Sequence, residues 1–108
     1  MAAVTQVTPA GLKAKMDARA PFCLLDVREP WEVALAAIPG SLNIPMNEIP
    51  ARLEELRGVG EIIVMCHAGG RSQRIADFLA AQGFSGVGNL QGGISAWSRD
   101  IDPGVPEY

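Results

Sequence analysis

Cysteine and histidine are scarce in this chain: its 108 residues include two cysteines and one histidine. Both cysteines, Cys23 and Cys66, lie in apolar runs rather than at the close spacings that mark a small disulfide-stapled domain. We therefore expect no disulfide, no bound metal and no cofactor. Free thiols fit the reducing cytoplasm best.

Long apolar runs and basic runs are absent as well. No stretch approaches the ~20 apolar residues that span a bilayer, and residues 1–16 lack the apolar core and the cleavage site of a signal peptide. The formal net charge is −3, and lysine and arginine are not clustered anywhere. The sequence thus predicts neither a membrane partner nor a nucleic-acid partner.

The length suits one compact domain over residues 1–108, and 48% of the residues are hydrophobic, which is enough for a core. The chain has no internal repeat and no low-complexity segment. Residues 103–108 contain two prolines and one glycine, and we expect them to form a surface tail.

Strand-like and helix-like segments alternate along the chain. Two continuous apolar runs, 22–27 and 61–66, lack the period-2 pattern of a half-exposed strand, so we expect strands buried on both faces. The alternation implies a parallel sheet covered by helices on both sides. The other expected strands are 4–7, 41–45 and 86–90, and the expected helices are 8–16, 29–37, 47–56, 71–82 and 92–100.

The most informative segment follows the second buried run, where Cys66 closes the strand and a loop with two glycines leads into a helix. Ligands of open parallel sheets bind beyond the carboxyl ends of the strands. Glycines allow several backbone N–H groups to point at one spot, and a helix N-terminus adds partial positive charge there. We expect this loop to hold an anion; its residues are His67, Ala68, Gly69, Gly70, Arg71 and Ser72.

Cys66 itself can be that anion. A free cysteine, of pKa about 8.5, is only a few per cent thiolate at neutral pH, and N–H groups together with Arg71 would lower that pKa. Because the thiolate is the nucleophile, the pattern predicts a nucleophilic cysteine. The alternative is a structural cysteine before an ordinary turn. The combination of cysteine, glycines, arginine and a helix start favours the nucleophile.

The loop sequence CHAGGRS, preceded by EIIVM, resembles the active-site loop of the rhodanese-type sulfurtransferases. Two further segments resemble signatures of that family: LLDVREPWEVALAAIPGSLNIP at 24–45 and LQGGISAW at 90–97. The resemblance covers nearly the whole chain in the family's order. It implies an α/β rhodanese-like three-layer fold, with a five-stranded parallel sheet flanked by helices.

The resemblance also implies a double displacement. The Cys66 thiolate takes the outer sulfur of a small anionic donor, with thiosulfate favoured, and the resulting persulfide gives this sulfur to cyanide or a thiol. Residues 67–72 are then expected to bind the substrate, with Arg71 recruiting the anion. Arg28 is expected to lie close to the pocket, on the substrate side.

Two alternatives remain open. The related cell-cycle phosphatases carry one more residue between cysteine and arginine, so the four residues between Cys66 and Arg71 favour sulfur transfer and leave phosphatase activity as a minor alternative. The other is a persulfide relay or regulatory module without turnover, which exchanges sulfur with a protein donor or acceptor through the same cysteine.

Neighbouring residues are assigned supporting roles. Glu32 either locks this region, as the resemblance implies, or is an ordinary helix-surface residue. His67 is expected to shape access to the loop rather than to act as a base, and Cys23 is expected to be buried and inert. Where many family members have Gly-His before IPG, this chain has Ala36-Ala37, which puts the local hydrogen bonding in doubt.

Overall fold

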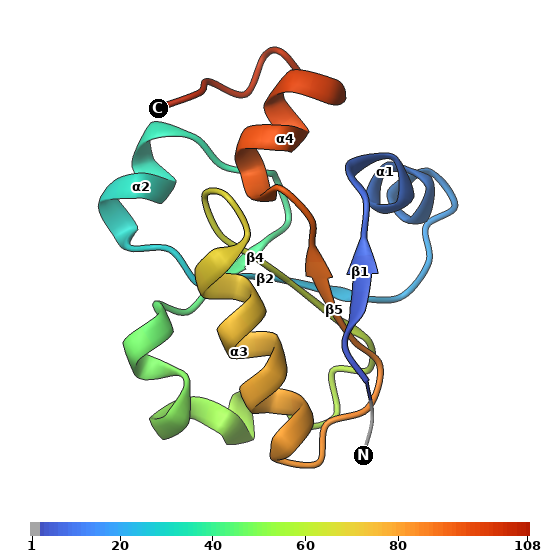
Figure 1. Cartoon of the computed structure of the whole chain (residues 1–108), viewed down its shortest axis with the longest axis vertical. Helices are drawn as coiled ribbons and strands as arrows, with labels where there is room; N and C mark the ends of the chain where they lie inside the picture. Colours follow the sequence, from blue (N-terminus) through green and yellow to red (C-terminus); the bar gives the residue numbers. More distant parts are fainter. Residues whose placement is uncertain (1–2) are drawn as a thin grey trace.

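The computed structural model describes residues 3–108 and, within them, contains a sheet of five parallel strands with helices on both sides (Figure 1). The order across the sheet is β1-β5-β4-β2-β3. This confirms the parallel α/β fold that the alternating pattern and the resemblance implied. The strands are β1 Thr5–Val7, β2 Cys23–Asp26, β3 Leu42–Asn43, β4 Ile62–Met65 and β5 Val87–Leu90.

The α-helices are α1 Pro9–Asp17, α2 Pro30–Leu35, α3 Gly70–Ala81 and α4 Gly93–Asp100. The first of them begins at a side-chain cap, because the Thr8 hydroxyl accepts a hydrogen bond from the Gly11 N–H at 3.0 Å. The third is followed by Gly83 at a φ of 92°, the left-handed conformation that ends helices. None of the described helices is long and apolar enough to cross a bilayer.

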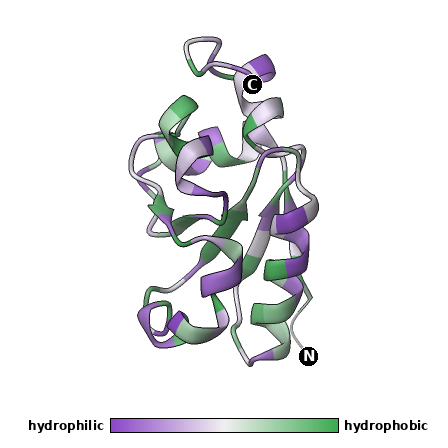
Figure 2. Ribbon diagram, turned by 90° about the vertical axis from the view of Figure 1, so that its left-hand side faces the viewer, coloured by the Kyte–Doolittle hydropathy of each residue, from purple (hydrophilic) through white to green (hydrophobic). Residues whose placement is uncertain are grey.

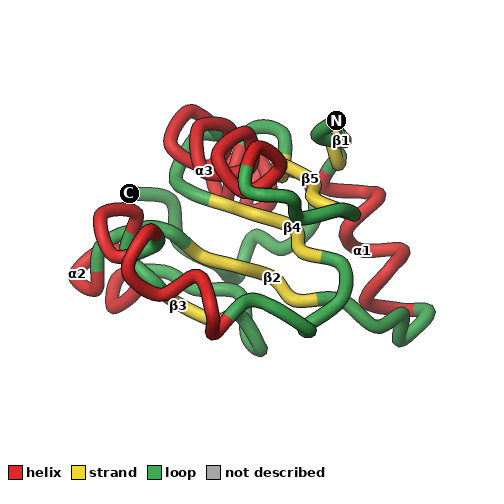
Figure 3. Tube along the Cα trace, turned by 90° about the horizontal axis from the view of Figure 1, so that it is seen from below, coloured by secondary structure: helices red, strands yellow, loops and turns green. Residues whose placement is uncertain are grey.

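The core lies on both faces of the sheet, which explains why the apolar runs are continuous. In β4, Ile62 and Val64 pack in one buried cluster with residues of α3, while Ile63 and Met65 pack in a second cluster with residues of α1 and α4. Figure 3 shows α3 and α1 on opposite sides of the row of strands. Hydrophobic residues are concentrated along these strands (Figure 2).

The helix predicted over 47–56 is wrong. The chain instead forms two 3₁₀ segments, Met46–Glu48 and Pro50–Glu55. Proline has no N–H to donate within a continuous helix, so the helical hydrogen bonding is interrupted at Pro50. Ile49 and Leu56 are nevertheless buried, so the segment still packs into the core.

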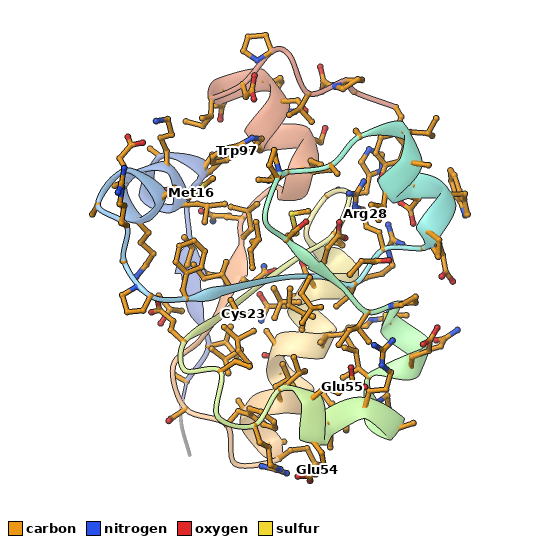
Figure 4. The ribbon with its side chains drawn as sticks, turned by 180° about the vertical axis from the view of Figure 1, so that it is seen from behind. Met16, Cys23, Arg28, Glu54, Glu55 and Trp97 are labelled. Atoms are coloured by element: carbon orange, nitrogen blue, oxygen red, sulfur yellow. The ribbon has the colours of Figure 1, made fainter. Side chains whose placement is uncertain are left out.

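Two smaller expectations also need correction. The helix predicted over 29–37 ends at Leu35, because Ala36 is already extended (φ −160°, ψ 134°). Cys23 was expected to be buried, but it is half-buried, and burial raises the pKa of its thiol. Figure 4 labels Cys23 at the start of β2 and Arg28, which follows the carboxyl end of that strand.

Candidate active site

Cys66 follows the last residue of β4, at the carboxyl edge of the sheet. It is buried (1% exposed), and the loop after it leads directly into α3. Gly69 caps this helix at a φ of 110°, a left-handed conformation that strains any other residue. The Gly69 N–H donates to the Cys66 Sγ at 3.1 Å, so the sulfur lies at the N-terminus of a helix.

A second helix N-terminus holds the backbone of the loop. The N–H groups of Ile94 and Ser95 in α4 donate to the carbonyl oxygens of Cys66 (2.9 Å) and His67 (3.1 Å). In a planar trans peptide the C=O and the next N–H point in opposite directions, so these bonds turn the following N–H groups away from α4. Gly93 allows this approach, since a Cβ there would lie 2.4 Å from the His67 carbonyl oxygen. This contact gives a physical reason for the second glycine in LQGGISAW.

The surroundings of Cys66 favour its thiolate. Burial is the largest influence and by itself raises the pKa of the thiol. Hydrogen bonds from the Ser72 side chain and from backbone N–H groups of Ser72, Gly69 and Ala68 outweigh it, so the pKa of Cys66 is lowered. A lowered pKa increases the nucleophilic fraction of the thiol at neutral pH.

A row of neutral side chains leads from Cys66 towards the surface. We call Ser72, Asn89, Gln6 and Gln73 the amide chain. The Ser72 Oγ is buried, 3.3 Å from the Cys66 Sγ and 2.5 Å from the Asn89 Oδ1. The Asn89 Nδ2 lies 3.2 Å from both the Gln6 Oε1 and the Gln73 Oε1.

A second group of polar residues, the charged cluster, comprises Asp26, Arg28, Glu32, Arg71 and Tyr108. Arg28 is fully buried and pairs with Asp26 through two bonds of 3.0 and 2.7 Å. Its guanidinium also donates to the carbonyl oxygens of Glu32 (3.3 Å) and Ala36 (2.7 Å) and to the Tyr108 hydroxyl (3.0 Å).

These contacts place Arg28 in a supporting position and not on the substrate side, where the resemblance had put it. A guanidinium has five N–H donors, and the five bonds of Arg28 use them all inside the protein. Ala36 accepts its bond from Arg28 through the backbone carbonyl, which any residue at this position supplies, so this hydrogen bond does not depend on the side chain of residue 36.

Glu32 joins the charged cluster to the active-site loop. Its two carboxylate oxygens accept hydrogen bonds from Arg71 at 2.7 and 2.9 Å, and one also accepts from the Tyr108 hydroxyl at 2.7 Å. Arg71 lowers the pKa of Glu32 to about 2, against the effect of burial and with a further contribution from Tyr108. Glu32 is therefore a buried lock and not a surface residue (4% exposed).

The predicted loop residues lie together, but with different surroundings. Ala68 and Gly70 are exposed, whereas Ser72 is buried beside the sulfur. His67 stacks on the ring of Tyr108, with ring centroids 4.3 Å apart and planes 15° apart. Arg71 is held by Glu32, with 34% of its side chain exposed.

Sequence reasoning missed the residues that reach this loop from distant elements. Asn89 on β5, Gln6 on β1 and Tyr108 at the end of the chain carry no local pattern that marks them. Gly93 was quoted only as part of a resemblance. Within residues 3–108, no group of three or more His, Cys, Asp or Glu side chains is placed to hold a metal ion.

Comparisons with known proteins agree on one family. Residues 8–100 match the family model described as Rhodanese-like domain. The chain is 37% identical over 100 residues to "Putative sulfurtransferase YtwF" of Bacillus subtilis, covering 93% of this chain and 96% of that protein. It is 41% identical over 76 residues to a protein named "Sulfurtransferase" of Allochromatium vinosum, covering 70% and 71%.

Solved structures and longer relatives extend this finding. The Rhodanese-like domain protein from Staphylococcus aureus superposes with a TM-score of 0.83 at 30% identity, covering 97% of this chain and 99% of that one. A longer relative is the chloroplastic Rhodanese-like/PpiC domain-containing protein 12 of Arabidopsis thaliana, 39% identical over 89 residues. That match covers 79% of this chain but 30% of the relative.

Proposed function

This chain belongs to the family of rhodanese-like domains, whose activity at the family level is sulfur transfer, and we propose that its Cys66 carries the transferred sulfur as a persulfide. The supporting observation is the position of the Cys66 sulfur, 3.1 Å from the Gly69 N–H at the N-terminus of α3. This position stabilises a negative charge on sulfur, first as the thiolate and then as the persulfide.

In the first step the Cys66 thiolate attacks the outer sulfur of the donor, with thiosulfate favoured. The thiolate electron pair forms the new S–S bond, the S–S bond of thiosulfate breaks, and sulfite leaves with the electron pair of that bond. One negative charge remains on the outer sulfur of the persulfide, where backbone N–H groups of the loop can hold it. Because the nucleophile reacts as a thiolate, the step needs no general base.

In the second step a cyanide ion or a thiolate attacks the outer sulfur of the persulfide. Cyanide leaves as thiocyanate, a thiolate acceptor leaves as a persulfide, and the Cys66 thiolate is restored with the electron pair of the broken S–S bond. His67 takes no part as a base in either step. Its ring is stacked on Tyr108.

The donor is small and carries a negative charge. Cys66 is only 1% exposed, which favours a compact donor over a bulky one. Arg71 supplies positive charge near the sulfur, but Glu32 binds it with both oxygens and reduces its attraction for an anion. The loop spacing keeps phosphatase activity a minor alternative.

The test is thiosulfate:cyanide turnover together with the intact mass of the protein. The wild-type chain is expected to turn over and, without acceptor, to gain the mass of one sulfur atom on Cys66. Cys66→Ser is expected to lose both, because a hydroxyl is far less nucleophilic than a thiolate. Cys23→Ser is the matched control and is expected to keep both.

Two results would contradict this function. One is that neither turnover nor a sulfur mass gain occurs with any sulfur donor. The other is that a phosphomonoester is hydrolysed at a rate comparable to thiosulfate turnover.

A persulfide relay is the second candidate, and the surface beside the loop favours it. In α2, Trp31 is 63% exposed and Leu35 is 52% exposed, and the Trp31 ring meets the Tyr108 ring edge to face at 6.4 Å. Apolar side chains so exposed beside the loop offer a contact for a protein donor or acceptor. Negligible thiosulfate turnover, together with transfer of one sulfur from a protein persulfide, would favour the relay.

A further inference from the structure

The amide chain beside Cys66 has a fixed hydrogen-bond direction, and a surface carboxylate sets it. Asp77 can only accept, so the Gln73 Nε2 at 3.0 Å from its Oδ1 must be the donor. The Gln73 Oε1 therefore faces inward, where the Gln6 Nε2 donates to it at 2.6 Å. With its nitrogen turned to Gln73, Gln6 presents its own Oε1 to Asn89.

Asn89 consequently has one satisfactory orientation. Its amide group faces two oxygens, the Gln6 Oε1 and the Gln73 Oε1, each at 3.2 Å, so the Nδ2 must point at them. Reversing the amide would bring three oxygens together. The Asn89 Oδ1 thus points at Ser72, and Asn89 is only 4% exposed.

The Ser72 hydroxyl has one proton and three acceptors within reach. The Asn89 Oδ1 lies at 2.5 Å, the Gly69 carbonyl oxygen at 3.2 Å and the Cys66 Sγ at 3.3 Å. The shortest of these hydrogen bonds is the one to the Asn89 Oδ1, so the Ser72 proton points at Asn89. Ser72 then turns a lone pair towards the sulfur, which suits a thiol S–H and opposes a thiolate. The Ser72 hydroxyl can lower the pKa of Cys66 only when it gives up its hydrogen bond to Asn89 and donates to the sulfur instead.

We propose that Asn89 is a positioning residue that competes with the Cys66 sulfur for the single proton of Ser72. When the sulfur is a neutral thiol, Asn89 keeps that proton. When the sulfur carries a negative charge, the hydroxyl turns to it and Asn89 loses its donor. Asn89 thereby moderates the reactivity of the resting cysteine, and this role rests on the proposed function only in that Cys66 is the nucleophile.

Other charged and titratable groups lie near Cys66 or contact residues that do. None of them is changed in the variants used in the test below. Arg71 lies in the first turn of α3 and donates to Glu32 of α2, and the Tyr108 hydroxyl of the tail also donates to Glu32. His67 is the next residue along the loop. Further charged groups near this edge are the buried Asp26–Arg28 pair after β2, Glu107, which accepts from the Ser95 hydroxyl of α4, and Asp77 at the outer end of the amide chain.

The test follows the rate of iodoacetamide alkylation of Cys66 against pH, read by peptide mass so that Cys23 is counted separately. Asn89→Leu keeps a similar side-chain volume and removes the oxygen that competes for the Ser72 proton. The pH midpoint of alkylation is expected to fall by about one unit, because the Ser72 hydroxyl can then donate to the thiolate without losing a bond to Asn89. Ser72→Ala is expected to raise the midpoint. In the Ser72→Ala background, Asn89→Leu is expected to have no effect on it.

Comparing Asn89→Leu with and without Ser72 distinguishes an effect of the Ser72 proton from an effect of a generally loosened site. A downward shift by Asn89→Leu that persists without Ser72 would overturn the proposal, as would an unchanged or raised midpoint in Asn89→Leu alone. The alkylation needs no sulfur donor. A chain with neither turnover nor a sulfur mass gain would contradict the proposed function and leave the alkylation result unaffected. Equal alkylation midpoints in the variants and the wild type would contradict this proposal and leave the proposed function unaffected.

A surface variant covers the case in which Asn89→Leu does not fold. Gln73→Met removes the group that orients Asn89 without changing charge, so Asn89 becomes free to reverse and donate to Ser72. The midpoint is then expected to fall, by less than in Asn89→Leu. The matched control is Gln82→Met at the far end of α3, with no shift expected. Equal midpoints in Gln73→Met and the wild type would count against the proposal.

Discussion

Two groups of polar side chains support the same cysteine loop, and they are built from opposite chemistry. The charged cluster pairs two arginines with two carboxylates and a tyrosine hydroxyl. The amide chain contains a hydroxyl and three amides and no charge. The charged cluster fixes where the loop lies, whereas the amide chain fixes where a single proton points.

The difference in magnitude explains this division. Hydrogen bonds to charged groups contribute roughly 1.5–3 kcal/mol each, and neutral ones about 1 kcal/mol. Breaking the charged cluster should therefore unfold or loosen the site. Breaking the amide chain should leave the fold nearly intact and move the protonation of the sulfur, because one pKa unit corresponds to about 1.4 kcal/mol.

The largest effect is expected when the buried arginine is removed. Arg28→Met leaves the Asp26 carboxylate buried without its partner, which costs about 3–5 kcal/mol. The measurement is the free energy of unfolding in urea. Lys13→Met, which breaks an exposed pair with Asp17, is the control and is expected to cost less than about 1 kcal/mol. An Arg28 variant as stable as the control would mean that the charged cluster does not hold the fold.

A smaller effect, with a marked pH dependence, is expected for Glu32→Gln. The folded-state pKa of Glu32, about 2, lies below the value of ~4.3 for a carboxyl in the unfolded chain. The stabilisation is thus complete above about pH 5 and is lost as the pH falls to about 2. We expect a difference of about 2 kcal/mol from wild type at pH 7, allowing for the part-exposed Arg71.

The measurement is urea unfolding of both proteins between pH 7 and pH 2.5. The difference should stay constant from pH 7 to about pH 5 and shrink below it. Glu54→Gln, at an exposed pair with Arg57, is the control and should show no such trend. A constant difference across the pH range would contradict the assignment of Glu32 as a buried, ionised lock.

The smallest stability effect is expected for Tyr108→Phe. The variant keeps the ring that stacks on His67 and loses the hydroxyl between Arg28 and Glu32, at a cost of about 1.5 kcal/mol, the low end for bonds to charged groups because Tyr108 is only half-buried. Urea unfolding measures this cost, and the pH midpoint of Cys66 alkylation tests the comparison itself. If Tyr108→Phe moves that midpoint as far as Asn89→Leu does, the two groups are not separate.

Much of the fold could be predicted from local pattern. The continuous apolar runs predicted the central strands because every residue of β4 is buried, on one face or the other. The helices predicted over 8–16 and 71–82 begin at Thr8 and end before Gly83, and such ends can be predicted because capping depends on neighbouring residues alone. The helix predicted over 47–56 failed because Pro50 lies inside this range and interrupts the hydrogen bonding there.

The site could be predicted only in part, because some of its residues are close along the chain and others are distant. The cysteine, its glycines and the following helix are contiguous, so the loop could be recognised. The partners of the two arginines could not be recognised, because Glu32 reaches Arg71 from α2 and Tyr108 reaches Arg28 from the tail. Both arginines were expected to face a substrate, and both are bound by carboxylates of the protein.

By itself, the sequence determined the alternation of strands and helices, the burial of the central strands and the place of Cys66 before a glycine loop. These depend on residue types that are close along the chain. Only the tertiary structure decided that β5 lies between β4 and β1, which brings Asn89 to Ser72 and Gln6 to Asn89. The direction of those hydrogen bonds follows from contacts between distant residues, and no local pattern encodes it.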